Sequence, residues 1–388
     1  MSSPGRRSTS ASSGRATSGS DASSSIGAPA ARSTDGTAAG PTGGSGNWQR
    51  RWQPLLGQWV IVSASTAARP WSGAMARGTT EEKPRHDPDC YLCPRVVRAN
   101  GTENPDYRGA FAFDNDFPSL SFDAPDPGEG KAPLARTAPA HGRCRVLCWS
   151  ERHDATLASL SDGEMRAVVR LWRDEYRRLA AEPGIANVLL FENKGTEIGV
   201  SNLHPHGQIY ATDFVTDTAT RLRESQAAHA RANGGASLLQ DMLAGPPVRD
   251  DLVVERGERH SVIVPFAARF AYESWIVPHR SVGSVAEMDD AELDELAALY
   301  RRQVRRYDLV FHRSAPNVTL LHNVPCDDHP DNAHWSFHLA FHPPLRDPEK
   351  MKFLAGFESG AGNIVNPLQP EHAAERLRAI DVDDWPPW

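Results

Sequence analysis

The segment Ser201–Gln208 (Ser-Asn-Leu-His-Pro-His-Gly-Gln) constrains the fold more than any other stretch of the chain. Pro205 lacks an N–H group and biases His204 toward extended geometry, so this segment does not lie inside a helix. Side chains two positions apart in an extended segment project to the same side, so His204 and His206 share a face that Gln208 continues. Such a face can bind a metal, attack an electrophile and stabilise an oxyanion.

An edge strand with two surface histidines would explain His-x-His alone, but related chemistry recurs at both ends of the chain. Cys90 and Cys93 have the CxxC spacing of metal ligands. Near the C-terminus, residues 334–342 alternate with period two and are followed by Pro343-Pro344. We expect a half-buried strand here, apolar on one face and rich in histidine on the other. The histidine-rich face carries His334, Ser336, His338, Ala340 and His342.

Residues 1–46 differ in composition from the rest of the chain. They are mostly Ser, Gly, Ala, Thr and Arg, with almost no large apolar side chain. Such a segment cannot bury enough surface to offset its ordering entropy, so we expect a disordered tail. Arg6-Arg7 suggests a twin-arginine export signal, but no apolar stretch follows it, so export is not expected.

Net charge and cysteine usage narrow the class of protein. A net charge of −7 is not that of a nucleic-acid-binding protein, which needs a basic stripe. No apolar run approaches the roughly 18–20 residues that span a bilayer, so we expect a soluble chain without a membrane partner. Five cysteines without a secretory signal indicate reduced thiols and a cytoplasmic location. The CxxC pair is then a metal site or, alternatively, a redox pair.

The remaining pattern predicts an α+β fold with a largely antiparallel sheet and helices packed on one face. Expected strands lie at 59–62, 143–149, 186–192, 252–255, 261–265, 272–278, 318–323 and 334–342. Expected helices lie at 161–181, 217–233, 289–311 and 370–380. Both halves place a helix before strands, which indicates a weak internal duplication with halves at 47–245 and 246–388.

Several ordered motifs make the chain resemble the galactose-1-phosphate uridylyltransferase family of the histidine-triad superfamily. The resemblance runs from about Trp48 to Arg378 and includes Ser201–Gln208. It implies a duplicated histidine-triad-like fold. The other matching segments are Gly57–Val60, Arg69–Trp71, His86–Cys93, Asn104–Tyr107, Asn115–Phe117, Phe191–Gly195 and Pro343–Arg346.

The resemblance implies a UDP-glucose–hexose-1-phosphate uridylyltransferase of galactose metabolism that works by ping-pong transfer of UMP. His206 would carry the uridylyl group covalently, and Gln208 would donate its amide N–H to a phosphoryl oxygen. Asn193, Lys194 and Ser201 would contact phosphates. Uridine and its phosphates would lie at Arg69, Asn115, Asp116 and Phe117. The family also implies a homodimer whose interface shares residues with the active site.

The resemblance further implies one structural zinc, held by Cys90, Cys93, His153 and His204. Some members have a second, iron-type site. In this sequence two of its ligand positions are His322 and His338, but the other two are Ala340 and Leu222, while Glu224 points off that helix face. We therefore expect no second metal, and we expect His334 and His342 to be strand-surface histidines.

The hexose-contacting segment departs from the family pattern. Lys352, Phe353 and Glu358 match it, but Phe357 replaces a tyrosine, and residues 359–366 lack the glutamine often used to bind the sugar. Hexose specificity therefore stays open. Two alternatives also stay open. One is a related nucleotidyltransferase or phosphorylase acting on another nucleoside diphosphate sugar, such as ADP-glucose, and the other is a non-catalytic, zinc-stabilised nucleotide-binding protein.

Overall fold

A computed structural model describes residues 48–63, 83–128, 134–246 and 248–386, all within one compact unit of residues 45–388. The predicted tail at 1–46 and the predicted uridine contact Arg69 lie outside the described residues. The helices are α1 (Asp162–Ala180), α2 (Asp217–Ala232), α3 (Leu238–Ala244), α4 (Asp290–Phe311), α5 (Phe357–Ala361) and α6 (Pro370–Arg378). The strands are β1 (Trp48–Gln53), β2 (Gln58–Ser63), β3 (Phe111–Asp114), β4 (Gly142–Cys148), β5 (Asn187–Lys194), β6 (His206–Thr212), β7 (Val253–Arg256), β8 (His260–Ile263), β9 (Ser274–Pro278), β10 (Asn317–His322), β11 (His338–His342), β12 (Leu345–Asp347), β13 (Lys350–Met351) and β14 (Val365–Asn366).

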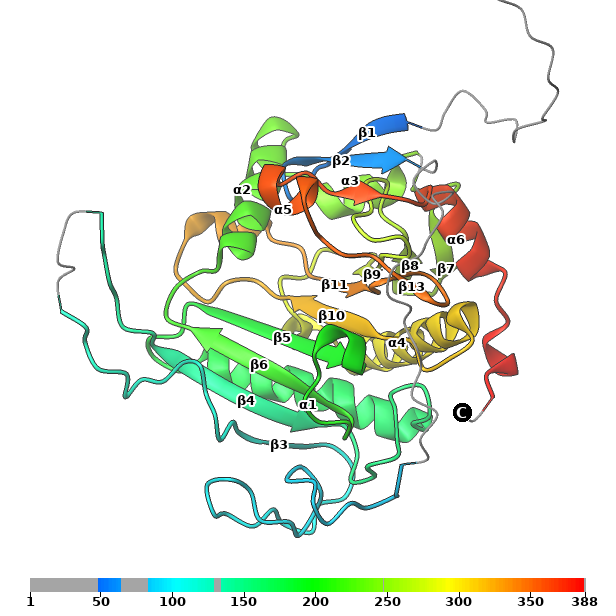
Figure 1. Ribbon diagram of the computed structural model, residues 1–388. Coiled ribbons are helices and arrows are strands. Elements are labelled where there is room, and N and C mark those ends of the chain that lie inside the picture. Colours follow the sequence, from blue (N-terminus) through cyan, green and yellow to red (C-terminus); the bar gives the residue numbers. More distant parts are fainter. Residues whose placement is uncertain (1–47, 64–82, 129–133, 247, 387–388) are drawn as a thin grey trace, which may run out of the picture. The chain divides into compact units, whose positions relative to one another are not determined.

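A nine-stranded sheet forms the centre of this unit, as Figure 1 shows. Its strand order is β3-β4-β6-β5-β10-β11-β9-β8-β7, and every neighbouring pair is antiparallel. The long helices α1 and α4 cover one face of it (Figure 1). The predicted α+β class and antiparallel sheet are confirmed.

The two halves of this sheet repeat one topology. Strand β4, helix α1 and strands β5 and β6 follow each other in the chain, and the strands lie in the order β4-β6-β5. Strand β9, helix α4 and strands β10 and β11 do the same, in the order β9-β11-β10. The halves meet where β5 pairs with β10. The predicted duplication is confirmed at the level of topology, and β6 corresponds to β11.

The two long helices begin at capping boxes. The Ser161 side chain accepts from the backbone N–H of Glu164, and the Glu164 carboxylate accepts from the backbone N–H of Ser161. Asp289 and Glu292 do the same at the start of α4. These contacts satisfy N–H groups that a helix leaves free at its first turn, so the predicted starts of both helices are confirmed.

Alternation along β6 separates a core face from an open face. Ile209 and Ala211 are buried in the core that α1 and α4 share with the sheet, whereas His206, Gln208 and Tyr210 are only partly buried. Successive strand residues project to opposite faces, so these three project away from the two long helices. The open face of the sheet therefore carries the candidate site.

The C-terminal histidine strand is shorter and more deeply buried than the alternation predicts. Pro330–His334 forms a 3-10 helix, since Pro330 supplies the fixed φ that favours a helical first turn, and β11 begins only at His338. His334 is thus not on the strand. His342 is not a surface histidine either, because its side chain is 12% exposed and lies 3.6 Å from Glu273.

The structure also shows a second sheet, the state of the cysteines and the character of the helices. A second sheet contains β1, β2 and β14, and α5 precedes β14 in the chain. All five cysteines are free thiols. Within the described ranges, no helix is both long enough and apolar enough to cross a bilayer.

Candidate active site and metal centre

Four side chains that are far apart in the sequence converge next to β6. Cys90, Cys93, His153 and His204 are all buried, and one donor atom from each lies within 4.8 Å of the others. The Nδ1 atoms of His204 and His153 are 3.5 and 3.7 Å from Cys93 Sγ. Two ligands of one tetrahedral zinc with S and N donors are separated by about 3.5–3.8 Å, given Zn–S and Zn–N bonds of roughly 2.3 and 2.0 Å. This donor set fits a closed four-coordinate metal site.

The outward-facing nitrogen of each histidine is held as well. His204 Nε2 lies 2.9 Å from the Ser150 carbonyl oxygen and 3.2 Å from the Tyr107 hydroxyl. His153 Nε2 lies 3.9 Å from an Asp87 carboxylate oxygen. A proton on Nε2 that is directed at an acceptor leaves Nδ1 free for a metal. Both rings are therefore oriented for ligation through Nδ1.

Burial disfavours the charged forms of these ligands in the absence of a metal. It raises the pKa of the Cys93 thiol to about 12 and lowers the pKa of His204 to about 4. A bound divalent cation would reverse the first effect, because it binds the thiolate and displaces the proton. Without a metal, the four-residue cluster therefore favours neutral imidazoles and thiols. A bound cation would take up their lone pairs as metal ligands.

The motif at residues 104–107, matched in the sequence without an assigned role, organises the CxxC loop. The Asn104 amide donates to the carbonyl oxygens of Tyr91 and Cys93 at 2.9 and 3.0 Å. The Tyr107 hydroxyl donates to the carbonyl oxygen of Leu92 at 2.6 Å. Asn202 was missed by sequence reasoning, although its position two residues before His204 was a usable signal. Its side chain lies 3.4 Å from Cys90 Sγ and accepts from the backbone N–H of His204 at 2.9 Å.

His206 is the first residue of β6, two residues after the candidate metal ligand His204. Its Nδ1 lies 2.7 Å from the backbone carbonyl oxygen of His204. A carbonyl oxygen only accepts, so Nδ1 carries the proton and the lone pair of the neutral ring is on Nε2. Burial lowers the pKa of His206, and the hydrogen bond to His204 opposes that shift. The hydrogen bond orients the ring, and burial favours the neutral form of the ring.

Strand pairing places the polar candidates beside His206. Phe191 pairs with Gln208 across β5 and β6, so Asn193 projects to the same face two residues farther along. Tyr210 lies on that face too, with its ring 5.4 Å from the ring of Phe191. Ser201 is exposed in the loop before β6.

Lys194 is placed elsewhere. Its ammonium donates to the Asp308 carboxylate of α4 at 2.9 Å, and both side chains are largely buried. Alternation along β5 sends Lys194 to the helix-covered face, opposite to Asn193. A buried carboxylate requires a cationic partner, which explains the direction. The placement does not support the predicted phosphate contact of Lys194.

The predicted uridine residues follow β3 at the sheet edge. Asn115 accepts from the backbone N–H of Phe117 at 2.9 Å, which forms a tight turn, and Phe117 is 73% exposed. Asp116 is buried in an ion pair with Arg98 at 3.2 Å. Ser119, at the end of this loop, lies 3.3 Å from the Tyr210 hydroxyl on the open face. The loop therefore reaches the face that carries His206 and offers an exposed aromatic ring.

The hexose-contacting segment lies against the second sheet. The Lys352 ammonium pairs with the Glu358 carboxylate and donates to the Val365 carbonyl oxygen at 2.7 Å. Glu358 also accepts from the backbone N–H of Val365, in β14, at 3.1 Å. Phe353 is 53% exposed. These contacts tie the segment to β14 rather than to β6, so the structure does not bring Glu358 into contact with His206 of the same chain.

His322 and His338 face each other across β10 and β11, with ring centroids 4.6 Å apart and nearly parallel planes. Burial lowers the pKa of both rings. Ala340 is buried on the same face, and Leu222 is buried on α2, while Glu224 is exposed. This pair therefore has an alanine and a leucine where the iron-type site has two further ligands.

Family models and curated relatives agree with this geometry. Residues 44–216 match the model described as galactose-1-phosphate uridyl transferase, N-terminal domain, and residues 221–385 match the C-terminal domain model. The galactose-1-phosphate uridylyltransferase of Haemophilus influenzae is 37% identical over 85% of this chain and 94% of its own length. The enzyme of the same name from Rattus norvegicus is 39% identical over 85% of this chain and 87% of its length.

Solved structures show the same fold. A uridylyltransferase structure superposes with a TM-score of 0.69 at 24% identity, covering 85% of this chain and 97% of the other. An ADP-glucose phosphorylase from Arabidopsis thaliana superposes with a TM-score of 0.70 at 20% identity, covering 86% and 99%. Identities this low carry information about the fold alone.

Proposed function

Since this chain belongs to the galactose-1-phosphate uridylyltransferase family, we propose that it transfers a uridylyl group between UDP-glucose and a hexose 1-phosphate. Galactose 1-phosphate is the main acceptor that we propose, and His206 carries the group. The observation that carries this proposal is the 2.7 Å contact between His206 Nδ1 and the His204 carbonyl oxygen. It fixes the proton on Nδ1 and leaves the Nε2 lone pair for attack. No separate base is needed, because a neutral imidazole is itself the nucleophile.

The transfer has two balanced half-reactions. His206 Nε2 attacks the α-phosphorus of UDP-glucose, a P–N bond forms, and the P–O bond to the β-phosphate breaks, so glucose 1-phosphate leaves with the electron pair. A phosphate oxygen of galactose 1-phosphate then attacks the same phosphorus, the P–N bond breaks, and UDP-galactose forms. The His204 carbonyl stabilises the positive charge that the ring carries while it is uridylylated.

Neighbouring polar groups would stabilise the phosphoryl oxygens. Gln208 projects from the same face of β6, one strand alternation beyond His206, and Asn193 projects beside it from β5. Their amide N–H groups can donate to oxygens on which charge builds during transfer. Ser201 is accessible for the same purpose.

Phe117 offers an exposed ring on which the uracil can stack, beside Asn115 and Asp116.

We propose that the four-ligand site binds zinc and that this zinc has a structural role. Cys90, Cys93, His153 and His204 would fill all four positions, so the metal would have no open position for a substrate. It would join the CxxC loop to the bend that presents His206, and the hydrogen bond from that ring depends on the position of the His204 carbonyl.

A homodimer would complete the sugar side of the site. Lys352 and Glu358 bind the backbone of β14, and neither contacts His206 within the described part of their own chain, which supports their action in the partner's site. Trp52 and Trp59 are exposed neighbours on β1 and β2 of the sheet that contains β14, and Phe353 is exposed in the segment before α5. With free thiols throughout, the cytoplasm is the compartment that we propose.

Mass measurement of the intact protein after mixing with nucleotide sugars tests the function. UDP-glucose and UDP-galactose should each add one uridylyl group and release the hexose 1-phosphate, whereas ADP-glucose should add nothing. Adduct formation from ADP-glucose and not from UDP-glucose would move the assignment to an ADP-glucose enzyme. Tight UDP-glucose binding without any adduct would leave only a nucleotide-binding protein.

A further inference from the structure

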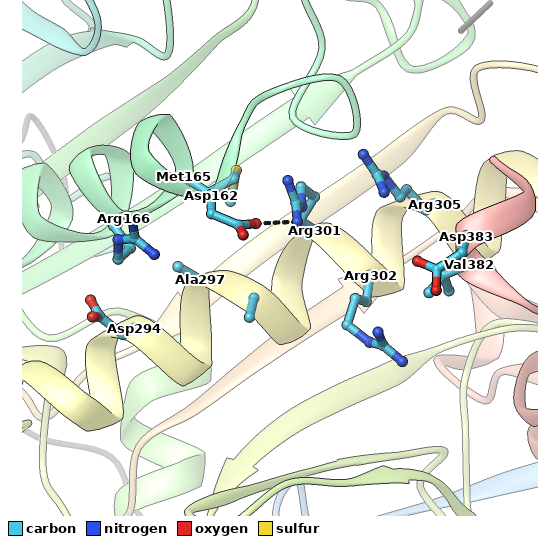
Figure 2. A pocket seen from close by; sticks show the side chains of 11 residues that line it. Asp162, Met165, Arg166, Asp294, Ala297, Arg301, Arg302, Arg305, Val382 and Asp383 are labelled. Atoms are coloured by element: carbon cyan, nitrogen blue, oxygen red, sulfur yellow. Dashed lines mark hydrogen bonds and ion pairs between the residues drawn. The ribbon is translucent and has the colours of Figure 1, made fainter. Parts of the chain in front are cut away.

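A hollow lies between α1, α4 and the 3-10 helix η5 (Val382–Asp384), on the side of the sheet opposite to His206. Figure 2 shows the side chains that line it. It encloses about 220 Å³, since Ala297 and Ala298 on α4 leave space beside the first turn of α1. We call it the arginine pocket, because four arginines line it, against three aspartates. These are Arg166, Arg301, Arg302 and Arg305, and Asp162, Asp294 and Asp383.

The arginines of α4 divide into two directions. Arg301 and Arg305 are one helical turn apart, so they lie on the same side of α4. Figure 2 shows Arg301 beside Asp162 of α1 and Arg305 farther along α4. Arg302 extends from a different side of the helix (Figure 2) and pairs with Glu255 of β7 at 2.9 Å. Arg301 and Arg305 are therefore the α4 arginines that project from the α1-facing side of the helix.

The positive charge facing the pocket is incompletely neutralised. Arg305 donates to the Ala158 carbonyl oxygen at 2.9 Å and stacks 4.9 Å from the Trp385 ring, so its direct partners are uncharged. Arg301 pairs with Asp162, but its Nε is buried and makes no hydrogen bond within the described part of the chain. Asp294 is engaged by Arg170 at 2.7 Å.

Two further features make the arginine pocket electropositive. Arg166 is exposed at its rim, and no carboxylate of the described residues lies within ion-pair distance of it. The N-terminal turn of the 19-residue helix α1 forms one wall and adds a partial positive charge. Burial, and then the charge of Arg301, lower the pKa of Arg305, although Asp383 and Asp162 partly offset this. A bound anion would relieve that repulsion.

We propose that the arginine pocket binds a phosphate dianion, either inorganic phosphate or the head of a small phosphomonoester. Arg301 and Arg305 are the principal ligands, and Arg166 closes the rim. Planar guanidinium groups match phosphate oxygens in pairs, which a single ammonium does not. The volume is below the roughly 300–1,000 Å³ of pockets for drug-sized molecules, so a nucleotide is too large.

Deuterium exchange of the whole protein, with and without inorganic phosphate at constant ionic strength, localises the binding. Phosphate should protect peptides that cover residues 158–167, 298–306 and 381–386. Phosphate bound at the candidate active site would instead protect peptides containing Asn193 and His206, so the two sites are read separately. A parallel arm with glucose 1-phosphate distinguishes the sources. Equal protection assigns recognition to the phosphate head, and stronger protection by the ester assigns it to a phosphomonoester.

Matched variants test the ligands. Arg305→Gln should weaken phosphate binding at these peptides by about 10-fold or more, as loss of a charged hydrogen-bonding pair does. Arg302→Gln removes the same charge from the same helix but from a side chain bound to Glu255, and should change binding by less than about 3-fold, a purely screened effect. Arg166→Gln should weaken binding several-fold, and it decides the question if Arg305→Gln does not fold, because Arg166 is exposed. No protection of these peptides at millimolar phosphate, or equal effects of Arg305→Gln and Arg302→Gln, would overturn the proposal.

Discussion

At the residue scale, the proposed mechanism depends on one backbone carbonyl and the ring nitrogen that faces it. The His204 side chain turns toward the metal ligands while its carbonyl oxygen accepts from His206 Nδ1. One residue thus links the candidate metal site to the proposed nucleophile. A change that moves the bend at His204 would weaken the hydrogen bond that holds the proton on His206 Nδ1.

We expect His206→Asn to abolish uridylyl transfer and adduct formation while the protein stays folded. An amide of similar size fills the space but offers no basic lone pair. Adduct mass with UDP-glucose and the thermal midpoint measure the two effects. His372→Asn, the same change at an exposed histidine of α6, is the control and should behave as wild type. Near-normal transfer by the His206 variant would refute the covalent mechanism.

We expect Glu358→Ala to lower the efficiency with hexose 1-phosphates by roughly 10²-fold, since losing an acceptor for buried hydroxyls costs ~2–3 kcal/mol. Labelling of His206 by UDP-glucose should change much less. We also expect glucose and mannose 1-phosphates to be accepted, because the segment lacks the family's glutamine. Steady-state assays with the three hexose 1-phosphates measure both effects, and Glu349→Ala, at an exposed glutamate nearby, is the control. Strict selectivity for galactose 1-phosphate would mean that the sugar site lies elsewhere.

At the scale of elements, the loop at residues 83–110 is held to the sheet by its metal ligands and a small core. Leu92, Phe113 and Val146 are buried together with Cys90 and Cys93, away from the main core. So small a cluster contributes little burial, and structural metals commonly supply the missing stability. We therefore expect the conformation of this loop to depend on a bound metal.

We expect about one zinc per chain, and we expect Cys90→Ser to lower both metal content and stability. A chelator should lower the thermal midpoint of the wild type but not that of the variant, because metal binding is coupled to folding. Cys144→Ser, at a buried thiol of β4 outside the ligand set, should keep the zinc. Metal analysis that finds no zinc, or a second metal at equal occupancy, would contradict this assignment.

Local signals predicted the elements whose cause is local. The capping-box spacing at Ser161 marked the start of α1, and the CxxC spacing of Cys90 and Cys93 marked the predicted metal-binding loop. The region at 334–342 could not be predicted, since its alternation does not reveal the 3-10 helix or the burial of both faces. The direction of Lys194 depends on Asp308, more than 100 residues away, so no local pattern contains it.

At the scale of the whole molecule, Trp52 and Trp59 expose neighbouring rings on the sheet that binds the predicted hexose-contacting segment, in which Phe353 is also exposed. We expect a homodimer in solution, and we expect Trp59→Glu to shift it toward the monomer, because a charge at an apolar interface is costly to desolvate. Sedimentation velocity measures this, with Leu134→Glu, at a fully exposed leucine, as the control. The monomer should lose hexose 1-phosphate use more than UDP-glucose labelling. A wild type that sediments as a monomer at all concentrations would exclude the shared site.

The repeated topology also bears on how many uridylyl groups one chain can carry. β6 and β11 are corresponding strands, and each begins with a histidine, His206 and His338. His338 is 2% exposed, between the rings of His322 and Trp275, and is closed to a nucleotide. We therefore expect at most one uridylyl group per protomer at any substrate concentration, because His338 is buried at the position that corresponds to the proposed nucleophile His206.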